Sequence, residues 1–316
     1  MNITQESIMQ KKKYHLVVLQ NGFNGNSWSI DMVKRRLLAE LDEQGSSCSS
    51  STRATEQSYS NHGGISASDI RIVISPTNIG SKSWDGIIKG SIRLANYIQS
   101  LDDGEYDRIS LIGLSLGGVY VRVCAKLLHE RGVFNNMTPK SLITISSPHC
   151  GIRNINVLFK SVVGFTQTGK ELLFADDTCF SVDNLNCRDT LLDICDDEYI
   201  SALNKFQSLT VYGNISGDSH VPLHSSCILN LVDVKHIIRK YSNNTNNKIH
   251  LFSDDEHSSS NSIDCEETYI VEKMKQISWR RKMINIQCII PSTAHFLIMI
   301  NKHILKDVIL TLKETV

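Results

Sequence analysis

The sequence predicts an α/β fold in which a mostly parallel central sheet carries helices on both faces. Segments with strand character alternate with segments of helical periodicity along most of the 316 residues, the order that a parallel sheet requires. One apolar strand also runs directly into Gly113-Leu114-Ser115-Leu116-Gly117 and then into a helix. The length suffices for one large core, so we expect a single domain over residues 1–316.

Apolar and β-branched runs predict the strands, and apolar residues spaced by three or four predict the helices. In chain order we expect a strand at 15–20, a helix at 28–41, a strand at 70–74, a helix at 85–100, the strand that enters Gly113, a helix at 119–129, strands at 142–146, 209–212 and 283–290, and a terminal helix at 294–312. Between 152 and 203 helical, partly amphipathic pieces replace this alternation, and we predict that they form a cap over the sheet.

Two polar segments also interrupt the alternation. Residues 44–68 are crowded with serine, and residues 241–267 are rich in asparagine, serine and acidic side chains. Neither segment has apolar periodicity, so neither can bury enough surface to offset the entropy of ordering it. We predict that both are disordered surface insertions; a regulatory role is the alternative.

Composition argues against several classes of protein. Lys plus Arg and Asp plus Glu both total 33, which gives no electrostatic case for binding nucleic acid. The first 13 residues lack the apolar core of a secretory signal, and no stretch approaches the roughly 18 apolar residues of a membrane span. The nine cysteines have no metal-ligand spacing. We therefore expect a cytoplasmic protein with reduced thiols and no metal site.

The pattern at residues 113–117 is G-x-S-x-G, which places a serine on a sharp turn between a strand and a helix. Gly113 and Gly117 make room for that turn, because a Cβ at either position would collide with neighbouring backbone. Since a strand precedes the motif and a helix follows it, we interpret Ser115 as a nucleophile. The alternative is a glycine-rich turn whose serine only caps the helix.

A nucleophilic serine needs a base and an orienting acid, which in such a sheet follow it in the order acid, then histidine, each after a strand end. Asp218 is the only carboxylate in the turn after the strand at 209–212, although a turn aspartate often bonds only its own backbone. His295 follows the last predicted strand directly and is our candidate base. Three other histidines compete less well, two because they break the order and one because it lies inside the final helix: His149, His220 and His303.

Two backbone N–H groups are needed to hold the oxyanion that forms during acyl transfer. One belongs to Leu116, the residue after the nucleophile. The other comes from the loop after the first strand, where Gly22 and Gly25 permit tight backbone and Phe23 carries the N–H. This Gly-x-x-Gly could also cradle phosphate, but the Gly-Lys-Ser/Thr of a P-loop is absent.

With these residues in hand, the chain resembles the eukaryotic putative serine esterase/lipase family of α/β-hydrolases. The resemblance covers most of the chain outside the two insertions. It rests on six ordered motifs: Asn21-Gly22-Phe23-Asn24-Gly25 with Trp28, Gly113 to Gly118 with Arg122, Ser146-Ser147-Pro148-His149-Cys150-Gly151, Thr168-Gly169-Lys170-Glu171-Leu172-Leu173 with Asp176 and Leu191-Leu192, Tyr212-Gly213-Asn214 with Asp218 to Val221, and Ala294-His295. Two positions depart from the family pattern, because Asn21 and Leu114 stand where the family has histidines. An asparagine at position 21 retains the ability to bond locally.

The resemblance implies a hydrolase that cleaves lipid-like carboxylic esters through an acyl-enzyme, with Ser115, Asp218 and His295 as its triad and no cofactor. A peripheral contact with membranes follows only if the cap is a mobile lid: its apolar face would then meet a lipid surface, and the lysines at 11–13 would make a weak electrostatic contact with anionic headgroups. The cap would act as a fixed packing layer or as a mobile lid. A thioesterase or protein deacylase would use the same triad, and a non-catalytic binding module of this fold is the alternative from another class.

Overall fold

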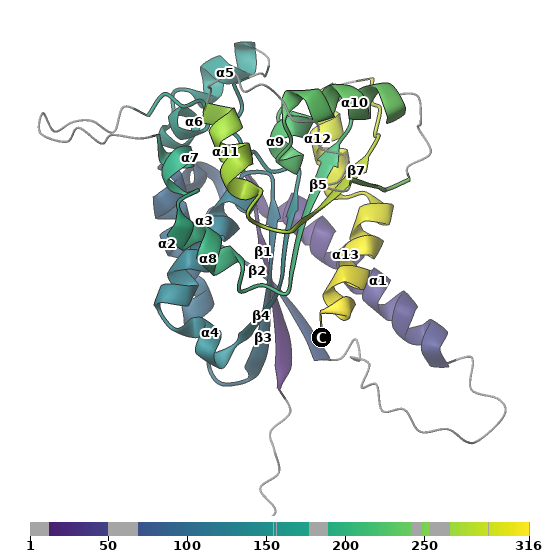
Figure 1. The fold of residues 1–316 in the computed structure, drawn as a ribbon. Coiled ribbons are helices and arrows are strands. Elements are labelled where there is room, and N and C mark those ends of the chain that lie inside the picture. The colour runs from purple at the N-terminus through teal and green to yellow at the C-terminus, as the bar shows by residue number, and fades with distance from the viewer. Residues whose placement is uncertain are drawn as a thin grey trace, which may run out of the picture.

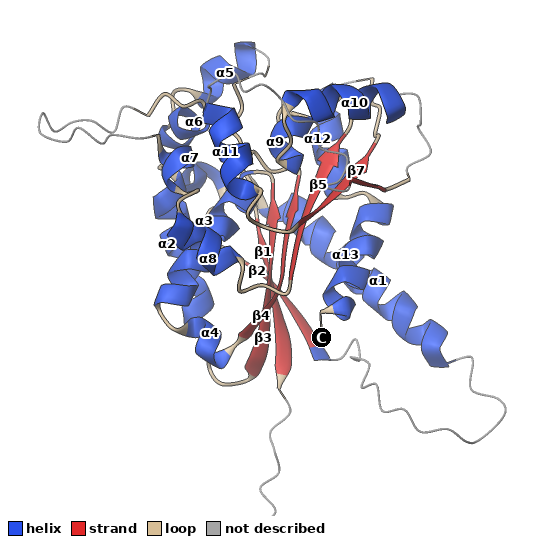
Figure 2. Ribbon diagram, in the orientation of Figure 1, coloured by secondary structure: helices blue, strands red, loops and turns tan. Residues whose placement is uncertain are grey.

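A seven-stranded sheet runs through the centre of the molecule in the order β2-β1-β3-β4-β5-β7-β6 (Figures 1 and 2). The computed structural model describes residues 13–49, 69–153, 155, 157–176, 189–241, 248–252, 266–289 and 291–315. The strands are β1 Tyr14–Gln20, β2 Ile70–Ile74, β3 Tyr106–Leu114, β4 Thr138–Ile145, β5 Ser208–Asn214, β6 His250–Phe252 and β7 Trp279–Ile284. All neighbouring pairs are parallel except β6 and β7, which are antiparallel. The predicted α/β fold, with a mostly parallel sheet, is confirmed.

Helices cover both faces of this sheet (Figure 1). α1 and α13 pack together on one face, and α2, α3 and α8 pack on the other. The helices are α1 Ser27–Ser49, α2 Ile87–Ser100, α3 Leu116–Glu130, α4 Val133–Asn136, α5 Val157–Val163, α6 Gln167–Leu172, α7 Thr190–Asp193, α8 Asp197–Leu203, α9 Leu223–Cys227, α10 Leu231–Tyr241, α11 Glu266–Met274, α12 Pro291–Met299 and α13 Lys302–Glu314, with a 3₁₀ turn, η2, at Gly80–Ser83.

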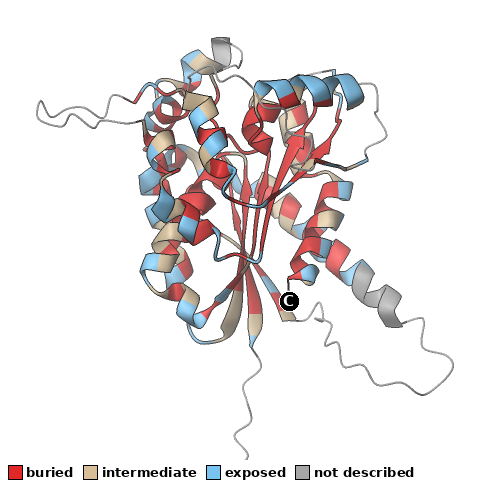
Figure 3. Ribbon diagram, in the orientation of Figure 1, coloured by how far each residue is buried: buried red, intermediate tan, exposed pale blue. Residues whose placement is uncertain are grey.

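The sequence of β1 shows why this sheet lies between two layers. Successive side chains of a strand point to opposite faces, so Leu16 and Val18 join the core on one side and Val17 and Leu19 join the core on the other. All four are fully buried, as the buried strands in Figure 3 illustrate. Each such burial is worth about 1.5–3 kcal/mol of transfer free energy, which accounts for the uninterrupted apolar run.

The order of the strands determines where the loops meet. From β1 the chain first pairs with β2 on one side and then returns to pair with β3 on the other side. The connections that leave the carboxyl ends of β1 and β3 therefore run in opposite directions along the sheet and leave a crevice between them. Open α/β sheets bind their ligands in a crevice of this kind. The segment 21–26 follows β1, and Ser115 follows β3.

Near the C-terminus, the predicted bounds of two elements are wrong. The last parallel strand is β7, Trp279–Ile284, rather than 283–290, because Arg281 is buried in it and donates to the carbonyl of Cys227. The terminal helix expected over 294–312 is divided into α12 and α13. Asn301 causes the break, since its side chain accepts hydrogen bonds from the first N–H groups of α13.

The two predicted insertions are only partly described by the structure. In 44–68, the backbone of 44–49 continues α1, and 50–68 lie outside the described residues. In 241–267, residues 250–252 form β6 and residues 266–267 begin α11, so for these residues the prediction of disorder is wrong. β6 is stabilised by backbone pairing with β7, which composition does not reveal; 242–247 and 253–265 lie outside the described residues.

The segment 152–203, predicted as a cap, contains α5 to α8. Val163, Leu172 and Phe174 are buried in the core beside α3, whereas Val162 and Phe165 are 67% and 88% exposed. The apolar residues of this segment thus form both a packing layer and an exposed surface. Among the described residues, no helix is both long and apolar enough to cross a bilayer.

Candidate active site

Ser115 lies at the junction of β3 and α3, in a backbone conformation that non-glycine residues rarely adopt. Its φ is 52° and its ψ is −128°, which costs free energy that the surrounding contacts must offset. The Ser115 N–H donates to the carbonyl of Ile145 at the end of β4, at 2.9 Å. The helix starts at the next residue, Leu116, so the serine side chain is held at the point where strand turns into helix.

Three glycines allow the chain to pass close to this serine. A Cβ on Gly113 would lie 2.4 Å from Cα of Gly118, and a Cβ on Gly117 would lie 2.3 Å from the carbonyl oxygen of Gln20. A Cβ on Gly22 would lie 2.7 Å from Cβ of Ser115. Each contact is shorter than real Cβ atoms tolerate, so the approach of the loop after β1 to the turn after β3 depends on glycine.

His295 lies in α12, and its imidazole bridges two other predicted site residues. Its Nε2 is 2.9 Å from Oγ of Ser115, and its Nδ1 is 2.9 Å from Oδ2 of Asp218. The three side chains come from loops or helices after β3, β5 and β7, and 180 residues separate Ser115 from His295. The structure thus brings Ser115, His295 and Asp218 into one hydrogen-bonded chain.

Asp218 follows β5, and only 2% of its side chain is exposed. Its Oδ1 accepts hydrogen bonds from the N–H groups of His220 at 2.9 Å and Val221 at 3.0 Å. Burial raises the pKa of Asp218, but the charge and hydrogen bond of His295, with further bonds from Ser146 and Val221, outweigh burial and leave the pKa below its ordinary value. The carboxylate is therefore ionised at neutral pH and can stabilise a positive imidazole.

Ser146 is a member of this cluster that the sequence analysis did not single out. It directly follows β4, is fully buried and has a φ of 49°. Its hydroxyl donates to Oδ2 of Asp218 at 2.5 Å and lies 3.2 Å from Nδ1 of His295. The signal in the sequence was the strand-end rule used for the other residues, because β4 neighbours β3 and Ser146 is the first residue after it.

The other histidines have different surroundings. The rings of His220 and His295 pack at 5.0 Å with a tilt of 32°, and burial, followed by the charge of His295, lowers the pKa of His220. His149 is buried away from Ser115 and bonded to Thr144 at 2.8 Å. His303 is exposed at the start of α13.

Within the described part of the chain, one group of His, Cys and acidic side chains lies close enough to ligate a metal: Asp218, His220 and His295. Both ring nitrogens of His295 already have partners, Ser115 and Asp218. A metal ion at this point would have to displace the bond between His295 and Asp218. The arrangement fits a proton-transfer chain better than a metal site.

The loop after β1 is held by Asn21, which stands where the resembled family has a histidine. Its side-chain oxygen accepts from the Gly22 N–H at 3.0 Å, and its side-chain nitrogen donates to the carbonyl of Asn26 at 2.9 Å. The asparagine thus does bond locally. In this loop the Phe23 N–H has no hydrogen-bond acceptor among the described residues. The Leu116 N–H lies in the first turn of α3, where the helix itself provides no carbonyl acceptor.

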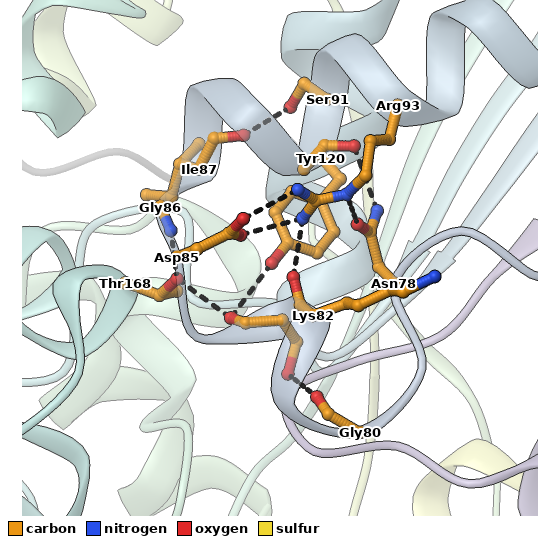
Figure 4. A network of polar contacts seen from close by, with 12 residues as sticks. Asn78, Gly80, Lys82, Asp85, Gly86, Ile87, Ser91, Arg93, Tyr120 and Thr168 are labelled. Atoms are coloured by element: carbon orange, nitrogen blue, oxygen red, sulfur yellow. Dashed lines mark hydrogen bonds and ion pairs between the residues drawn. The ribbon is translucent and has the colours of Figure 1, made fainter.

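A polar network attaches this loop to α6 and α3, and Figure 4 shows the part of it at Thr168 and Tyr120. The Asn24 N–H donates to the hydroxyl of Ser83 at 2.7 Å. The carbonyl of Ser83 in turn accepts from Thr168 of α6 at 2.8 Å and from Tyr120 of α3 at 3.2 Å. The end of η2 is therefore a common point of attachment for the loop after β1, the cap segment and the helix that follows Ser115.

Arg93 of α2 anchors the same region from the other side (Figure 4). Its guanidinium donates to both carboxylate oxygens of Asp85 at 2.7 Å and to the side-chain oxygen of Asn78 at 2.9 Å. The hydrogen bond from Arg93 holds the pKa of Asp85 below its ordinary value. This paired geometry fixes the segment from Asn78 to Asp85 against α2.

Two pockets border both Ser115 and His295. The first has a volume of about 360 Å³ and is bounded mainly by the cap and the turns after β4 and β5: Phe23, Asn24, Leu116, Pro148, Ile152, Val162, Val163, Leu172, His220 and Val221. The second has a volume of about 310 Å³ and is bounded by the loop after β1, the start of α1 and α12. A group bound to Ser115 Oγ therefore borders two pockets whose other lining residues differ.

A serine at the turn between a parallel strand and a helix, bonded to a histidine that is bonded to an aspartate, defines the class of α/β-hydrolases. The chain belongs within that class to the family described as "Putative serine esterase (DUF676)", which it matches over residues 10–229. The family membership expected from the sequence motifs is confirmed. The matched range contains Ser115 and Asp218 and ends before His295.

Two proteins of Saccharomyces cerevisiae are similar to this chain. "Putative lipase YDL109C" is 27% identical over 247 residues, which are 75% of this chain and 34% of that protein. "Putative lipase ROG1" is 28% identical over 237 residues, which are 72% of this chain and 30% of that protein. The chain thus spans about a third of the length of these relatives. Among solved structures, a lipase-esterase related protein from Clostridium acetobutylicum has 14% identity and a TM-score of 0.42, over 97% of this chain and 96% of that one.

Proposed function

We propose that this protein hydrolyses carboxylic esters, with Ser115 as nucleophile, His295 as general base and Asp218 as the acid that orients it. The observation that carries the proposal is the continuous hydrogen-bonded chain from Ser115 Oγ through both nitrogens of His295 to Asp218. Membership of a serine esterase family and the hydrolase fold support ester hydrolysis as the reaction. These three groups are those that serine acyl transfer requires.

In this mechanism Ser115 Oγ bonds to the ester carbonyl carbon while its proton passes to Nε2 of His295. The carbonyl oxygen becomes an oxyanion and accepts hydrogen bonds from the N–H groups of Phe23 and Leu116. When the tetrahedral intermediate collapses, His295 gives its proton to the departing alkoxide. Water then attacks the acyl-enzyme in the same way, with His295 as base, and releases the acid and free Ser115.

The first pocket supports a lipid-like acyl group as the substrate. Its walls are mainly aliphatic and come partly from the cap, through Val163 and Leu172, and partly from Pro148, Ile152 and Val221. Apolar walls favour a methylene chain because it needs no hydrogen-bond partner when it leaves water. The cap segment 152–203 thus contributes directly to the proposed acyl site.

A fluorophosphonate probe tests the proposal because it phosphonylates only an activated serine. We expect one probe molecule per protein, attached to Ser115. The rate of hydrolysis of a soluble p-nitrophenyl ester should fall in proportion to the labelled fraction of the protein. Peptide mapping by mass spectrometry locates the label. A folded protein that takes up no probe would favour the non-catalytic binding module, and a label on another serine would contradict the assignment of Ser115.

Replacing Ser146 with alanine should lower kcat/KM about tenfold through kcat, with KM little changed. The hydroxyl is a positioning group, since it donates to Asp218 and helps to keep the pKa of that carboxyl low. Without it, Asp218 is more basic and the Asp218–His295 pair retains its proton to higher pH. The acidic limb of the pH profile of kcat/KM should therefore move to higher pH.

The neighbouring Ser147 provides a matched control for this variant. It is also fully buried, and its hydroxyl has no hydrogen-bond partner within the described structure. Ser147→Ala should leave the pH profile in place. If Ser146→Ala lowers the melting temperature but leaves the acidic limb where it was, Ser146 has only a structural role.

A further inference from the structure

The second pocket differs in chemical character from the aliphatic first pocket, although both border Ser115. Its lining residues are Asn21, Gly22, Phe23, Asn24, Gly25, Asn26, Trp28, Ser29, Ser115, His295, Phe296 and Met299. Apart from His295 the lining contains no residue of an ionisable type, but it contains three amides and one hydroxyl besides Ser115. The first pocket offers one amide, Asn24, among mainly aliphatic walls.

One wall of the second pocket is an aromatic surface. Trp28 is 60% exposed, and its ring lies nearly parallel to that of Phe296, with 6.0 Å between centroids and 16° between planes. Offset stacking on Phe296 holds the indole in place while most of its surface stays exposed. The pair offers an apolar face next to the reacting serine.

Polar groups of the loop face the same space. The side-chain amide of Asn24 makes no hydrogen bond within the described structure, and in Asn26 only the side-chain oxygen is engaged, by the Ser29 N–H. Asn21 uses both ends of its amide to hold the loop. Asn24 and the amide nitrogen of Asn26 are therefore available to a ligand, whereas Asn21 is not.

We infer that the second pocket binds the alcohol portion of the ester, and that this alcohol is an uncharged, hydroxylated ring such as a monosaccharide. The inference rests on the proposed function, since it specifies the substrate of the same serine. A ring of this kind presents C–H groups on one face, which suit Trp28, and hydroxyls at its edge, which suit Asn24 and Asn26. A phosphate or carboxylate headgroup would find no cationic lysine or arginine there to pair with it.

The two pockets divide the substrate between them. With the oxyanion between the N–H groups of Phe23 and Leu116, the acyl chain and the alcohol must leave the reacting carbon in different directions. An acyl chain in the second pocket would cover unpaired amides without replacing their bonds to water, which costs free energy. His295 borders both pockets, so it can give its proton to an alcohol oxygen that leaves into the second one.

The test compares two esters that share one acyl chain, 6-O-octanoylglucose and ethyl octanoate. We expect the wild-type protein to have a higher kcat/KM for the glucose ester. Trp28→Ala should reduce the ratio of the two kcat/KM values about tenfold, since an aromatic contact of this kind is worth about one factor of ten in rate. Asn24→Gly, which suits the positive φ of 49° at this position, should reduce the ratio as well.

Trp84 supplies the matched control. It too is an exposed tryptophan, at 42%, and stacks on a phenylalanine, Phe23, at 6.4 Å, but it lines neither pocket. Trp84→Ala should leave the ratio unchanged. A wild-type ratio near one, or a Trp28→Ala variant that slows both esters equally, would overturn the inference and leave the proposed esterase intact. A higher rate with octanoylglycerol or octanoyl lysophosphatidylcholine would also overturn it, in favour of another alcohol.

Binding to the Ser115→Ala variant separates the two proposals. Calorimetry with 6-O-octanoylglucose should detect a complex that is weakened about tenfold when Trp28 is also replaced. If neither octanoyl ester is hydrolysed and no probe labels Ser115, the esterase proposal fails, while this titration still decides whether the pocket binds the sugar ester. Absence of binding to Ser115→Ala overturns the inference about the pocket.

Discussion

Replacing either Ser115 or His295 with alanine should reduce ester hydrolysis by about 10⁴ to 10⁶-fold, and the double variant should be hardly slower than either single one. The reason lies in the direct bond of 2.9 Å between Ser115 Oγ and His295 Nε2. The two groups act as one unit, because the hydroxyl is a poor nucleophile without its base, and without the hydroxyl the base has no nucleophile to activate for acylation. Stopped-flow or endpoint rates on one p-nitrophenyl ester, with melting curves to verify folding, measure the effect.

His303→Ala is the control for the histidine variant, because His303 is exposed at the start of α13 and lies outside the proposed machinery. It should retain the wild-type rate. Full activity in His295→Ala together with loss of activity in His220→Ala would reassign the base to the ring that stacks on His295. Losses that add up in the double variant would mean that Ser115 and His295 act in separate steps.

Asp218→Asn should reduce kcat by about 10⁴-fold and so leave more residual activity than Ser115→Ala. The substitution retains an oxygen that can accept from Nδ1 of His295, but removes the charge that stabilises the imidazolium. Oδ2 of Asp218 accepts from both His295 and the Ser146 hydroxyl, so both bonds persist only when the amide oxygen of the variant takes that side. Single-turnover rates separate this loss of acylation from any change in binding.

Correct folding of Asp218→Asn should be checked by thermal melting, because the carboxylate is buried and accepts two backbone N–H groups. A variant that melts like the wild type and hydrolyses esters at the wild-type rate would show that Asp218 only orders its own turn. That is the alternative that the sequence leaves open for a turn aspartate.

The sequence predicts the fold well where a buried element has a simple pattern of apolar residues. β1 is apolar on both faces because it lies between two cores, and its strand is predicted within one residue. Residues stabilised by contacts distant in sequence are harder to predict. The apolar pattern places the start of the last parallel strand at 283, whereas β7 begins at Trp279 and includes Arg281. This arginine can be buried in the strand because it donates to the carbonyl of Cys227, a contact that the local sequence does not reveal. β6 is only three residues long, His250–Phe252, too short for a pattern of its own, and it depends on β7 for its backbone pairing.

The candidate site is predicted to a similar extent and for the same reasons. Ser115, Asp218 and His295 could be chosen by their places after strands, because parallel strands direct their carboxyl ends to one edge of the sheet. Ser146 occupies an equivalent place after β4, but a serine in a Ser-Ser-Pro turn has no distinctive signature. Its role appears only when the distance to Asp218 is known. The second pocket likewise depends on Phe296 of α12 stacking on Trp28 of α1, 268 positions away in the numbering.

The wide separation of the site residues along the chain has a consequence for biogenesis. Ser115 and His295 are 180 residues apart, and His295 follows β7, which leaves the ribosome after the other six strands of this sheet. A nascent chain that has completed β1 to β4 already contains the serine turn but lacks the proposed base, so we expect no ester hydrolysis from it. Since chain segments this distant assemble late, esterase activity during refolding reports the docking of the C-terminal strand and helices, and it should return after secondary structure has formed.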